Sequence, residues 1–413
     1  MFEMNTDRMQ TAILVAVDIG DYDVEVSLDE LEELANTAGA TVIARFTQNL
    51  KKPNGGTFVG TGKLQEIKQF CVNSEADLII FDSELSPTQI KNIENETERT
   101  IIDRTMLILD IFAQRALTKE GKLQVELAQQ RYILPRLIGL GTVLSRLGGG
   151  IGTRGPGESK LETDRRHIRR RIELLSEQLA ELQKHRDFVR NRRKKDDILT
   201  VAIVGYTNVG KSTLLNALTD ADVMAEDKLF ATLDLTSRAL ELPDGRTVIL
   251  IDTVGFIRRL PHHLVEAFKS TLEEAVSADV ILNICDASSS DAQIQIDVTE
   301  KLLTELGVEN TPIIRVYNKC DKLAHQLFPL NEHSVTISAK TRFGFDALLN
   351  MIVKNLPVGQ RRMKLKIPYD KGFLISKIRE TGKVLSEEFL GDGLLIDASV
   401  DEKMVHMVLE FQQ

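Results

Sequence analysis

Residues 199–218, LTVAIVGYTNVGKSTLLNAL, constrain the fold of this chain more strongly than any other stretch of its sequence. A β-rich run leads into Gly205-x-x-x-x-Gly210-Lys211-Ser212, and a helix-forming run follows directly. Phosphate-binding loops have this strand–loop–helix context, because glycines let backbone N–H groups point inward and the helix N-terminus attracts an anion. The stretch therefore predicts a P-loop domain of the α/β class, with a mostly parallel sheet.

Three further motifs follow in the order that a GTP-binding domain requires, each at the expected carboxyl end of a strand. They are TVILIDTVGF at 247–256, TPIIRVYNKCD at 311–321 and SVTISAK at 334–340. A carboxylate at Asp321 can accept from both N1–H and the exocyclic amine of guanine, whereas adenine offers neither donor in that arrangement. Asp321, expected to be buried, therefore predicts guanine as the base.

The phosphate and metal roles follow from the same motifs. We expect Lys211 to reach the β- and γ-phosphates, Ser212 and Asp252 to hold Mg²⁺, and the Gly255 N–H to sense the γ-phosphate. The stretch KLFATLDLTSR at 228–238 should form the first switch, in which Thr232 closes on Mg²⁺ and the γ-phosphate, with Thr236 as the alternative. The predicted metal ligands are Ser212, Thr232 and Asp252, and the predicted catalytic residues are Lys211, Thr232, Gly255 and Asn208. The predicted nucleotide-binding residues are Gly205, Tyr206, Thr207, Asn208, Val209, Gly210, Lys211, Ser212, Thr213, Phe230, Ala231, Thr232, Leu233, Asp234, Asp252, Thr253, Val254, Gly255, Asn318, Lys319, Cys320, Asp321, Ser338, Ala339 and Lys340.

Two residues bear on the rate of hydrolysis. Ras-like enzymes place a water-orienting glutamine after Asp-x-x-Gly, and this chain has Phe256 there, which cannot hydrogen-bond water. Hydrolysis should therefore be slow alone and should depend on a partner or an added ion. Asn208 stands where potassium-stimulated GTPases carry an asparagine, although it could equally stabilise the turn of the loop.

The rest of the chain divides by its sequence pattern. Residues 1–104 alternate strand and helix patterns and predict a small α/β domain with a parallel sheet. Residues 105–197 carry two apolar stripes at helical spacing and predict an antiparallel helical hairpin with a glycine-rich tip at 139–157, each arm roughly 45–50 Å long. Residues 198–356 form the P-loop domain, and residues 361–413 predict a small α+β domain.

Charge is unevenly distributed along the chain. The net charge is −9, which argues against a protein that coats nucleic acid, yet residues 154–195 hold 14 Lys and Arg against 7 Asp and Glu. A charged helix is usually a solvated face, but this asymmetry favours an electropositive arm on an acidic body. The three cysteines are far apart in sequence and fit a reducing cytoplasm. We expect no membrane insertion, because no apolar run approaches the length of a span.

Taken together, GTRGPGESKLETDRR, FVGTGKLQEI, FATLDLTSR and DTVGFI resemble the motifs of the HflX family, in the Obg–HflX branch of translation-factor GTPases. The resemblance covers roughly residues 8–356, and Leu235 departs from the proline expected in FATLDPT. It implies binding to the large ribosomal subunit and a role in splitting stalled ribosomes, with the hairpin tip directed at ribosomal RNA. On this basis we expect a monomer without a DNA partner. The residues predicted to contact ribosomal RNA are Arg146, Arg154, Arg165, Arg166, Arg169, Arg170 and Arg171.

Three alternatives stay open at this point. The stretch GGTFVGTGKL at 55–64 superficially resembles a second phosphate loop, although its spacing is one residue too long and Leu64 replaces the Mg²⁺-binding hydroxyl. A loop that contacts RNA is favoured there over a second nucleotide site. The chain could act in assembly of the large subunit rather than in recycling. An RNA-modifying role is disfavoured, because residues 1–150 show no Cys/His or paired-carboxylate constellation.

Overall fold

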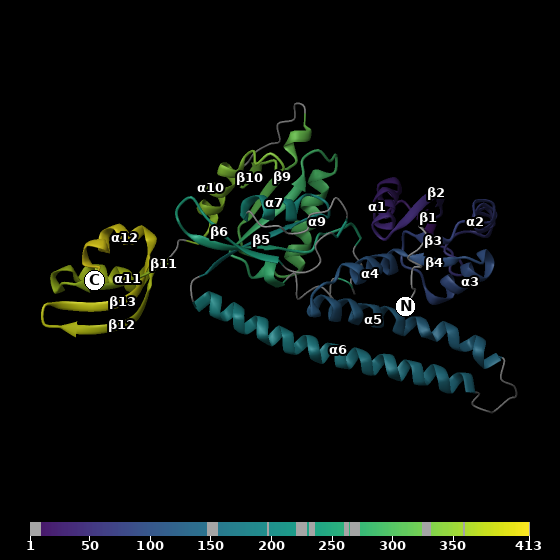
Figure 1. The fold of residues 1–413 in the computed structure, drawn as a ribbon, viewed down its shortest axis with the longest axis horizontal. Helices are drawn as coiled ribbons and strands as arrows, with labels where there is room; N and C mark the ends of the chain where they lie inside the picture. Colours follow the sequence, from purple (N-terminus) through teal and green to yellow (C-terminus); the bar gives the residue numbers. More distant parts are fainter. Residues whose placement is uncertain are drawn as a thin grey trace.

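The computed structural model describes residues 10–146, 156–195, 198–219, 229–230, 236–259, 264, 273–323, 332–357 and 360–412. Three sheets follow one another along the long axis of the molecule, and a helical hairpin runs beneath the first two (Figure 1). The predicted α/β class with a mostly parallel P-loop sheet is confirmed. No helix in the described part of the chain is both long and apolar enough to cross a lipid bilayer.

The first sheet has four parallel strands in the order β2-β1-β3-β4, with helices in the connections. Central strand β1 reads as an apolar run because both of its faces are buried. The carboxylate of Asp23 caps the first helix by accepting from the amides of Glu25 and Val26. The elements are β1 (Gln10–Asp18), α1 (Val24–Thr37), β2 (Ala40–Asn49), α2 (Thr61–Ser74), β3 (Leu78–Phe81), α3 (Pro87–Thr97) and β4 (Thr100–Asp103).

The middle region contains three helices: α4 (Arg104–Arg115), α5 (Lys119–Arg146) and α6 (Pro156–Lys195). Helix α4 belongs to the core of the first sheet, so the first predicted apolar stripe is split between that core and the hairpin. The break falls between α4 and α5, and Gly121 lies inside α5. Helices α5 and α6 form the hairpin, and fully buried Leu175 packs between them on Leu123 and Leu127.

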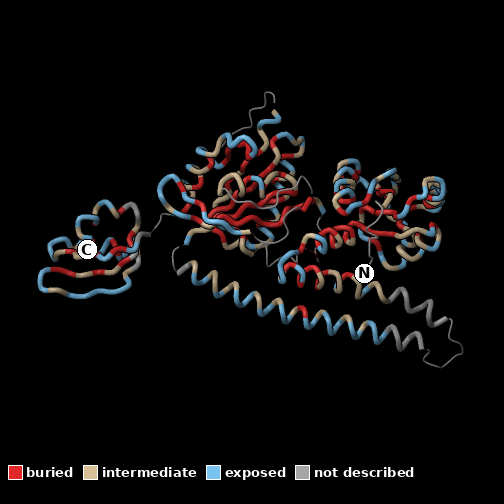
Figure 2. The backbone as a smooth tube through the Cα atoms, viewed as in Figure 1, coloured by how far each residue is buried: buried red, intermediate tan, exposed pale blue. Residues whose placement is uncertain are grey.

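The glycine-rich tip is shorter than predicted. Helix α5 continues to Arg146 and α6 begins at Pro156, so both ends of the predicted tip at 139–157 are helical. Residues 147–155, including Arg154, lie outside the described part of the chain. At 1.5 Å per residue, α6 is roughly 60 Å long, which exceeds the predicted arm. Figure 2 shows that α6 is mostly exposed or half-buried, unlike the sheets.

The second sheet has six strands in the order β10-β9-β8-β5-β7-β6. Only β6 among the described strands of this sheet runs antiparallel to its neighbour. Strand β5 lies in the middle, and the loop after it is therefore surrounded by the ends of other strands. The elements are β5 (Leu199–Gly205), α7 (Lys211–Thr219), β6 (Thr236–Glu241), β7 (Thr247–Asp252), β8 (Val280–Asp286), α9 (Ala292–Glu305), β9 (Ile313–Asn318), β10 (Ser334–Thr336) and α10 (Phe345–Asn355).

The C-terminal unit is a three-stranded antiparallel sheet in the order β11-β13-β12, packed against two helices. The outer strand β11 and the central strand β13 overlap the two strand patterns of residues 361–413, KLKIP and GLLIDASV, while the other outer strand, β12, was not predicted. The elements are β11 (Gln360–Ile367), α11 (Gly372–Thr381), β12 (Lys383–Leu390), β13 (Gly393–Asp401) and α12 (Glu402–Val408).

Segments beside the second sheet are buried in the apolar core of the first domain. Phe230, beside the predicted first switch, makes an edge contact with Phe112 of α4, with ring centroids 4.6 Å apart. Val254 and Ile257, which follow β7, are buried in the same cluster as α1 and α4. Residues next to the predicted nucleotide site are thus packed directly against the N-terminal domain.

Candidate functional site

The predicted motifs meet at one edge of the second sheet. Parallel strands end on the same side, and ligands of such sheets bind outside the carboxyl ends. Strand β5 ends at Gly205, β7 at Asp252 and β9 at Asn318, while Ser338 follows β10. The sequence therefore placed these motifs correctly relative to one another.

The loop after β5 requires glycine at both ends. Gly205 has φ of +145°, and a Cβ built on it would lie 2.2 Å from the carbonyl oxygen of Ile284. Gly210 has φ of +94°, and a Cβ there would lie 2.5 Å from Asn318 Nδ2. Both positions exclude a side chain on conformational and steric grounds, since positive φ is disfavoured for residues that carry a Cβ. The backbone can therefore curve closely around a phosphate.

Lys211 lies at the start of α7 and is only 7 % exposed. Its ammonium donates to the carbonyl oxygens of Tyr206, at 2.7 Å, and Gly205, at 3.2 Å. Burial lowers the pKa of Lys211 to about 8, partly opposed by the nearby charge of Asp252. A desolvated ammonium at a helix N-terminus is suited to bind an anionic phosphate oxygen.

Two of the three predicted metal ligands are adjacent. The hydroxyl of Ser212 donates to Asp252 Oδ2 at 2.7 Å, and Asp252 is fully buried at the end of β7. A hydroxyl and a carboxylate beside a phosphate site fit the oxygen ligands that Mg²⁺ takes. Thr232 lies outside the described residues. Its alternative, Thr236, begins β6 and is paired in register with Asp252.

Asn318 and Lys319, from the predicted base-recognition motif, also hold the loop after β5 in place. The buried side chain of Asn318 donates to the carbonyl oxygen of Val209 at 2.8 Å and accepts from the Ala339 amide at 2.9 Å. Lys319 donates to the carbonyl oxygen of Asn208 at 2.7 Å and pairs with Asp286 at 2.9 Å. These contacts tie the loop after β5 to the segments that follow β9 and β10.

Asp321 is exposed, which corrects the expectation that it is buried. Its Oδ1 accepts from the hydroxyl of Ser338 at 2.6 Å, and this contact orients the carboxylate. Exposure weakens the argument that ATP would leave a buried charge unpaired. The complementarity between a carboxylate and two guanine donors does not require burial and still applies.

The remaining predicted nucleotide-binding residues lie around this edge. Val209, Thr253, Val254 and Ala339 are buried, and the Thr253 hydroxyl donates to the Ile203 carbonyl oxygen. Thr213 and Lys340 are exposed, Cys320 is half-buried, and Phe230 is buried against α4. Ala231, Leu233 and Asp234 lie outside the described residues.

The structure shows how Phe256 and Asn208, the two residues expected to bear on the rate of hydrolysis, are placed. The ring of Phe256 is 2 % exposed and lies in the core of the second sheet, while its amide donates to the Gly205 carbonyl oxygen at 3.0 Å. The side chain is therefore enclosed by apolar groups and offers no atom that could orient an attacking water. Asn208 has φ of +59°, a conformation that asparagine tolerates better than most residues. This observation supports the role of Asn208 in the turn and leaves the potassium role open.

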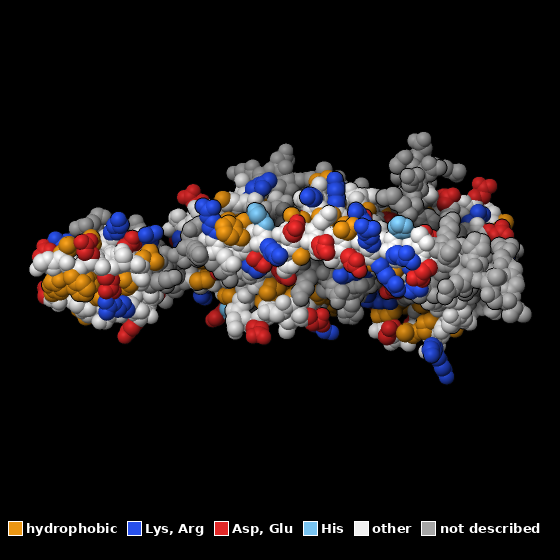
Figure 3. All heavy atoms as spheres, turned by 90° about the horizontal axis from the view of Figure 1, so that it is seen from below, with side chains coloured by type: hydrophobic (Ala, Val, Ile, Leu, Met, Phe, Trp, Pro, Cys, Tyr) orange, Lys and Arg blue, Asp and Glu red, His pale blue; other side chains and the backbone are white. Residues whose placement is uncertain are grey.

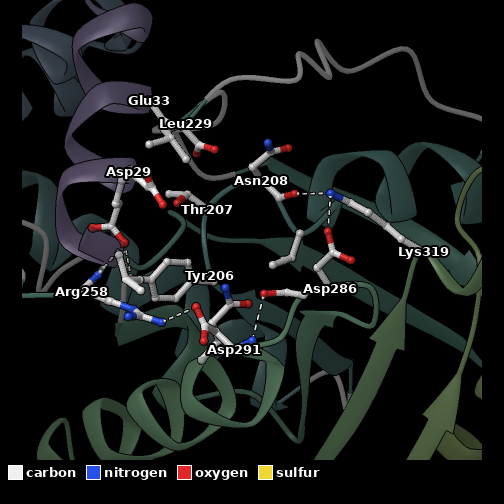
Figure 4. A pocket seen from close by; sticks show the side chains of 15 residues that line it. Asp29, Glu33, Tyr206, Thr207, Asn208, Leu229, Arg258, Asp286, Asp291 and Lys319 are labelled. Carbon is white, nitrogen blue, oxygen red and sulfur yellow. Dashed lines mark hydrogen bonds and ion pairs between the residues drawn. The ribbon is translucent and has the colours of Figure 1, made fainter. Parts of the chain in front are cut away.

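A pocket of about 220 Å³, which we did not predict from the sequence, lies between α1 and the loop after β5. Asp29 and Glu33 of α1 face Thr207 and Asn208 across it (Figure 4). On its floor, the hydroxyl of Tyr206 donates to Glu30 of α1 at 2.6 Å. Its walls thus come from two domains, which no local motif could predict.

The stretch at 55–64 does not form an open phosphate loop. Every amide from Gly56 to Gly60 donates within the domain: two to the side chain of Asn54, one to its carbonyl oxygen, one to the Thr57 carbonyl oxygen and one to Gln48. Those amides are therefore already used, and the geometry gives no support to a second nucleotide site at this loop.

Four of the predicted RNA-contacting arginines are accessible on α6. Arg166, Arg169 and Arg170 are exposed and Arg165 is half-buried. Arg171 is exposed but forms two hydrogen bonds with Glu126 of α5, at 2.6 and 2.8 Å, which raise its pKa and hold the hairpin together. Arg146 ends α5, and Arg154 lies outside the described residues.

Comparison with known families agrees with this geometry. Models described as the N-terminal region and the middle region of GTP-binding GTPases match residues 25–113 and 115–193. A model described as a 50S ribosome-binding GTPase matches residues 200–319. A GTPase HflX from Caldanaerobacter subterraneus is 55 % identical over 97 % of this chain and 93 % of its own length.

The chain belongs to the HflX family of GTPases. Its likeness to other family members is similarly extensive. The GTPase HflX of Lacrimispora saccharolytica is 50 % identical over 96 % of this chain and 94 % of that protein. The GTPase HflX of Escherichia coli is 42 % identical over 94 % of this chain and 92 % of that protein. A GTP-binding protein from Sulfolobus solfataricus, solved with GDP, is 27 % identical, covers 84 % of this chain and 98 % of its own, and has a TM-score of 0.45.

Membership of this family makes the chain a GTP hydrolase that binds GTP and GDP. The site fits the activity in physical terms, because the glycine-bounded loop after β5 and the buried ammonium of Lys211 are suited to bind phosphate groups. The sequence-based recognition of the HflX family is confirmed.

Replacing Asp321 should change the base that the HflX GTPase accepts. In Asp321→Asn, one side-chain oxygen becomes an amide donor, which opposes the guanine donors and complements the extra acceptor of xanthine. We expect GTP affinity to fall roughly ten- to a hundredfold, and affinity for xanthosine triphosphate to appear. Equilibrium titration with both nucleotides measures this. Asp346→Asn, an exposed aspartate on α10, should leave both affinities unaltered; unaltered GTP affinity in Asp321→Asn would remove Asp321 from base recognition.

Proposed function

We propose that this HflX GTPase binds the large ribosomal subunit and uses GTP to remodel, split or recycle ribosomes, under stress among other conditions. The observation that carries the proposal is the match of residues 200–319 to a 50S ribosome-binding GTPase model. The hairpin supplies a means of contact, because α6 projects an exposed arginine group from an otherwise acidic chain. The curated relatives named HflX support the family-level part of this proposal.

The proposed RNA-contacting surface is a group of arginines on α6, of which Arg165 is half-buried and Arg166, Arg169 and Arg170 are exposed. Figure 3, a view from the hairpin side, shows Lys and Arg side chains exposed along this face among acidic ones. Guanidinium groups contact RNA phosphates and release counterions, whereas the acidic remainder of the chain discourages indiscriminate binding to RNA. Arg171 has a structural task instead, since Glu126 holds it.

The cofactor part of the proposal rests on the donor set. Ser212 and Asp252 would hold Mg²⁺, which would neutralise charge on the phosphates, and Thr232 would complete the set from the first switch. Potassium would act beside Asn208. We further infer that the protein works as a monomer in the cytoplasm, where ribosomes are, and that its hydrolysis is slow until the ribosome stimulates it.

Purified large ribosomal subunits should raise the hydrolysis rate. Phe256 is buried in the core and cannot orient water, so a partner has to supply what this chain lacks. We expect steady-state phosphate release to rise by at least about tenfold with large subunits, by analogy with partner-assisted GTPases. Small subunits at equal concentration are the control. Equal rates with both subunits would contradict the proposed partner.

Sedimentation separates recycling from subunit assembly. A recycling factor should convert intact ribosomes into subunits in the presence of GTP, whereas an assembly factor should sediment with immature large subunits and leave intact ribosomes unchanged.

Neutralising the exposed arginines should change the salt dependence of subunit binding. Each phosphate contact contributes roughly 0.7–0.9 to the slope of log affinity against log salt. Arg166→Gln, Arg169→Gln and Arg170→Gln together should therefore reduce the slope by about 2. A control variant neutralises the exposed lysines Lys354, Lys364 and Lys377 on other elements. The same slope in the arginine and control variants would exclude α6 from the RNA interface.

A further inference from the structure

A buried charge cluster joins the N-terminal domain to the nucleotide site. We call Glu30, Asp82 and Arg104 of the N-terminal domain, with Arg259 of the segment after Gly255, the interdomain charge cluster. Arg104 lies at its centre with a 3 % exposed side chain, pairs with Glu30, and donates to Asp82 Oδ1 at 2.9 Å. Asp82 is fully buried, and the side chain of Glu30 is 11 % exposed.

The N-terminal domain supplies two carboxylates and one guanidinium to this cluster, so its own charges do not cancel. The hydroxyls of Ser27 and Tyr22 also donate to Asp82 Oδ2, and a second positive charge further compensates this buried carboxylate. The second guanidinium comes from Arg259 of the GTPase domain, which donates to Asp82 Oδ2 at 2.8 Å and lies over the ring of Tyr22, 3.9 Å from its centroid. Charge compensation in the N-terminal domain therefore depends on the segment that follows Gly255.

The same cluster holds the loop that cradles the phosphates. Glu30 Oε2 accepts from the hydroxyl of Tyr206, a residue of that loop, at 2.6 Å. Arg104 Nη2 donates to the backbone carbonyl oxygen of Arg258 at 3.0 Å. Only two residues separate Gly255 from Arg258, so the γ-phosphate sensor and the interdomain contact lie on one short piece of backbone.

Gly255 is pressed against the phosphate-binding groups. A Cβ built on it would lie 2.8 Å from Lys211 Nζ, 2.7 Å from Thr207 Cγ2 and 2.9 Å from Thr207 Cα. A γ-phosphate that contacts both the Lys211 ammonium and the Gly255 amide must lie between them, in a space too narrow even for a Cβ on Gly255. Its binding therefore requires Gly255 to withdraw from the loop.

We propose that Glu30 is a positioning residue of the GTPase site. It stabilises the position of Gly255 seen in this structure, close to Lys211 and Thr207, and so lowers the affinity for the triphosphate relative to the diphosphate. It acts on the loop through its hydrogen bond with the Tyr206 hydroxyl. It acts on the segment after Gly255 through its ion pair with Arg104, which donates to the Arg258 carbonyl oxygen. GDP has no γ-phosphate and does not require Gly255 to move. Because coupling between two sites is reciprocal, binding of GTP in turn loosens the docking of the N-terminal domain.

Glu30→Gln tests this role in the full-length protein. The substitution keeps the shape of the side chain and removes the charge that attracts Arg104. We expect the affinity for a non-hydrolysable GTP analogue, divided by the affinity for GDP, to rise by about fivefold, at the lower end of typical coupling factors. Glu32→Gln is the matched control: Glu32 lies on the same helix but pairs with Arg45 of β2, inside the N-terminal domain. Its ratio should equal that of the unmodified protein.

Tyr206→Phe approaches the same hydrogen bond from the GTPase side and decides the question if Glu30→Gln does not fold. It should raise the affinity ratio in the same direction, and the double variant should add less than the sum of the two single effects. A purely structural role would change both nucleotides by the same factor. An affinity ratio that stays constant or falls in the folded variants would overturn the proposal.

Discussion

The close approach of Gly255 to the loop after β5 is the contact on which the rest of the site depends. Pairing between β5 and β7 continues past Asp252 through two backbone hydrogen bonds. The Phe256 amide donates to the Gly205 carbonyl oxygen, and the Thr207 amide donates to the Phe256 carbonyl oxygen. This pairing places the Asp-x-x-Gly backbone on the phosphate cradle. No side chain fits at Gly255, so the sequence of the motif follows from the packing.

One short segment therefore serves three purposes. Asp252 accepts from Ser212 at the predicted phosphate site, Gly255 leaves no room for a Cβ beside Lys211, and Arg259 pairs with Asp82 of the N-terminal domain. A rigid displacement at one of these positions has to be accommodated at the others, since packed interfaces are not continuously deformable. Phe230, which lies in the stretch predicted to form the first switch, adds a further contact with the N-terminal domain through Phe112. The predicted nucleotide site and the N-terminal domain are therefore linked through contacts rather than through proximity alone.

Local pattern was sufficient to predict much of this molecule. The P-loop, the strands of both parallel sheets and the hairpin follow from periodicity and from glycine spacing, which depend on neighbours in sequence. Other features depend on distant residues. Helix α4 packs into the first core because its apolar face matches α1, and the exposure of Asp321 depends on how β9 ends. The contact of Tyr206 with Glu30 joins residues 176 positions apart, and neither belongs to a spacing motif that suggests the other.

Amide hydrogen exchange in the full-length protein tests the central claim most directly. It compares Val254–Arg259 and α1 in the GDP complex and in the complex with a non-hydrolysable GTP analogue, with the C-terminal sheet as an internal reference. With the analogue bound, amide exchange in Val254–Arg259 and in the part of α1 that contacts this segment should be faster than with GDP bound. Exchange in the reference sheet should be the same in both complexes. Equal exchange of Val254–Arg259 in the two complexes, or slower exchange with the analogue, would contradict the central claim.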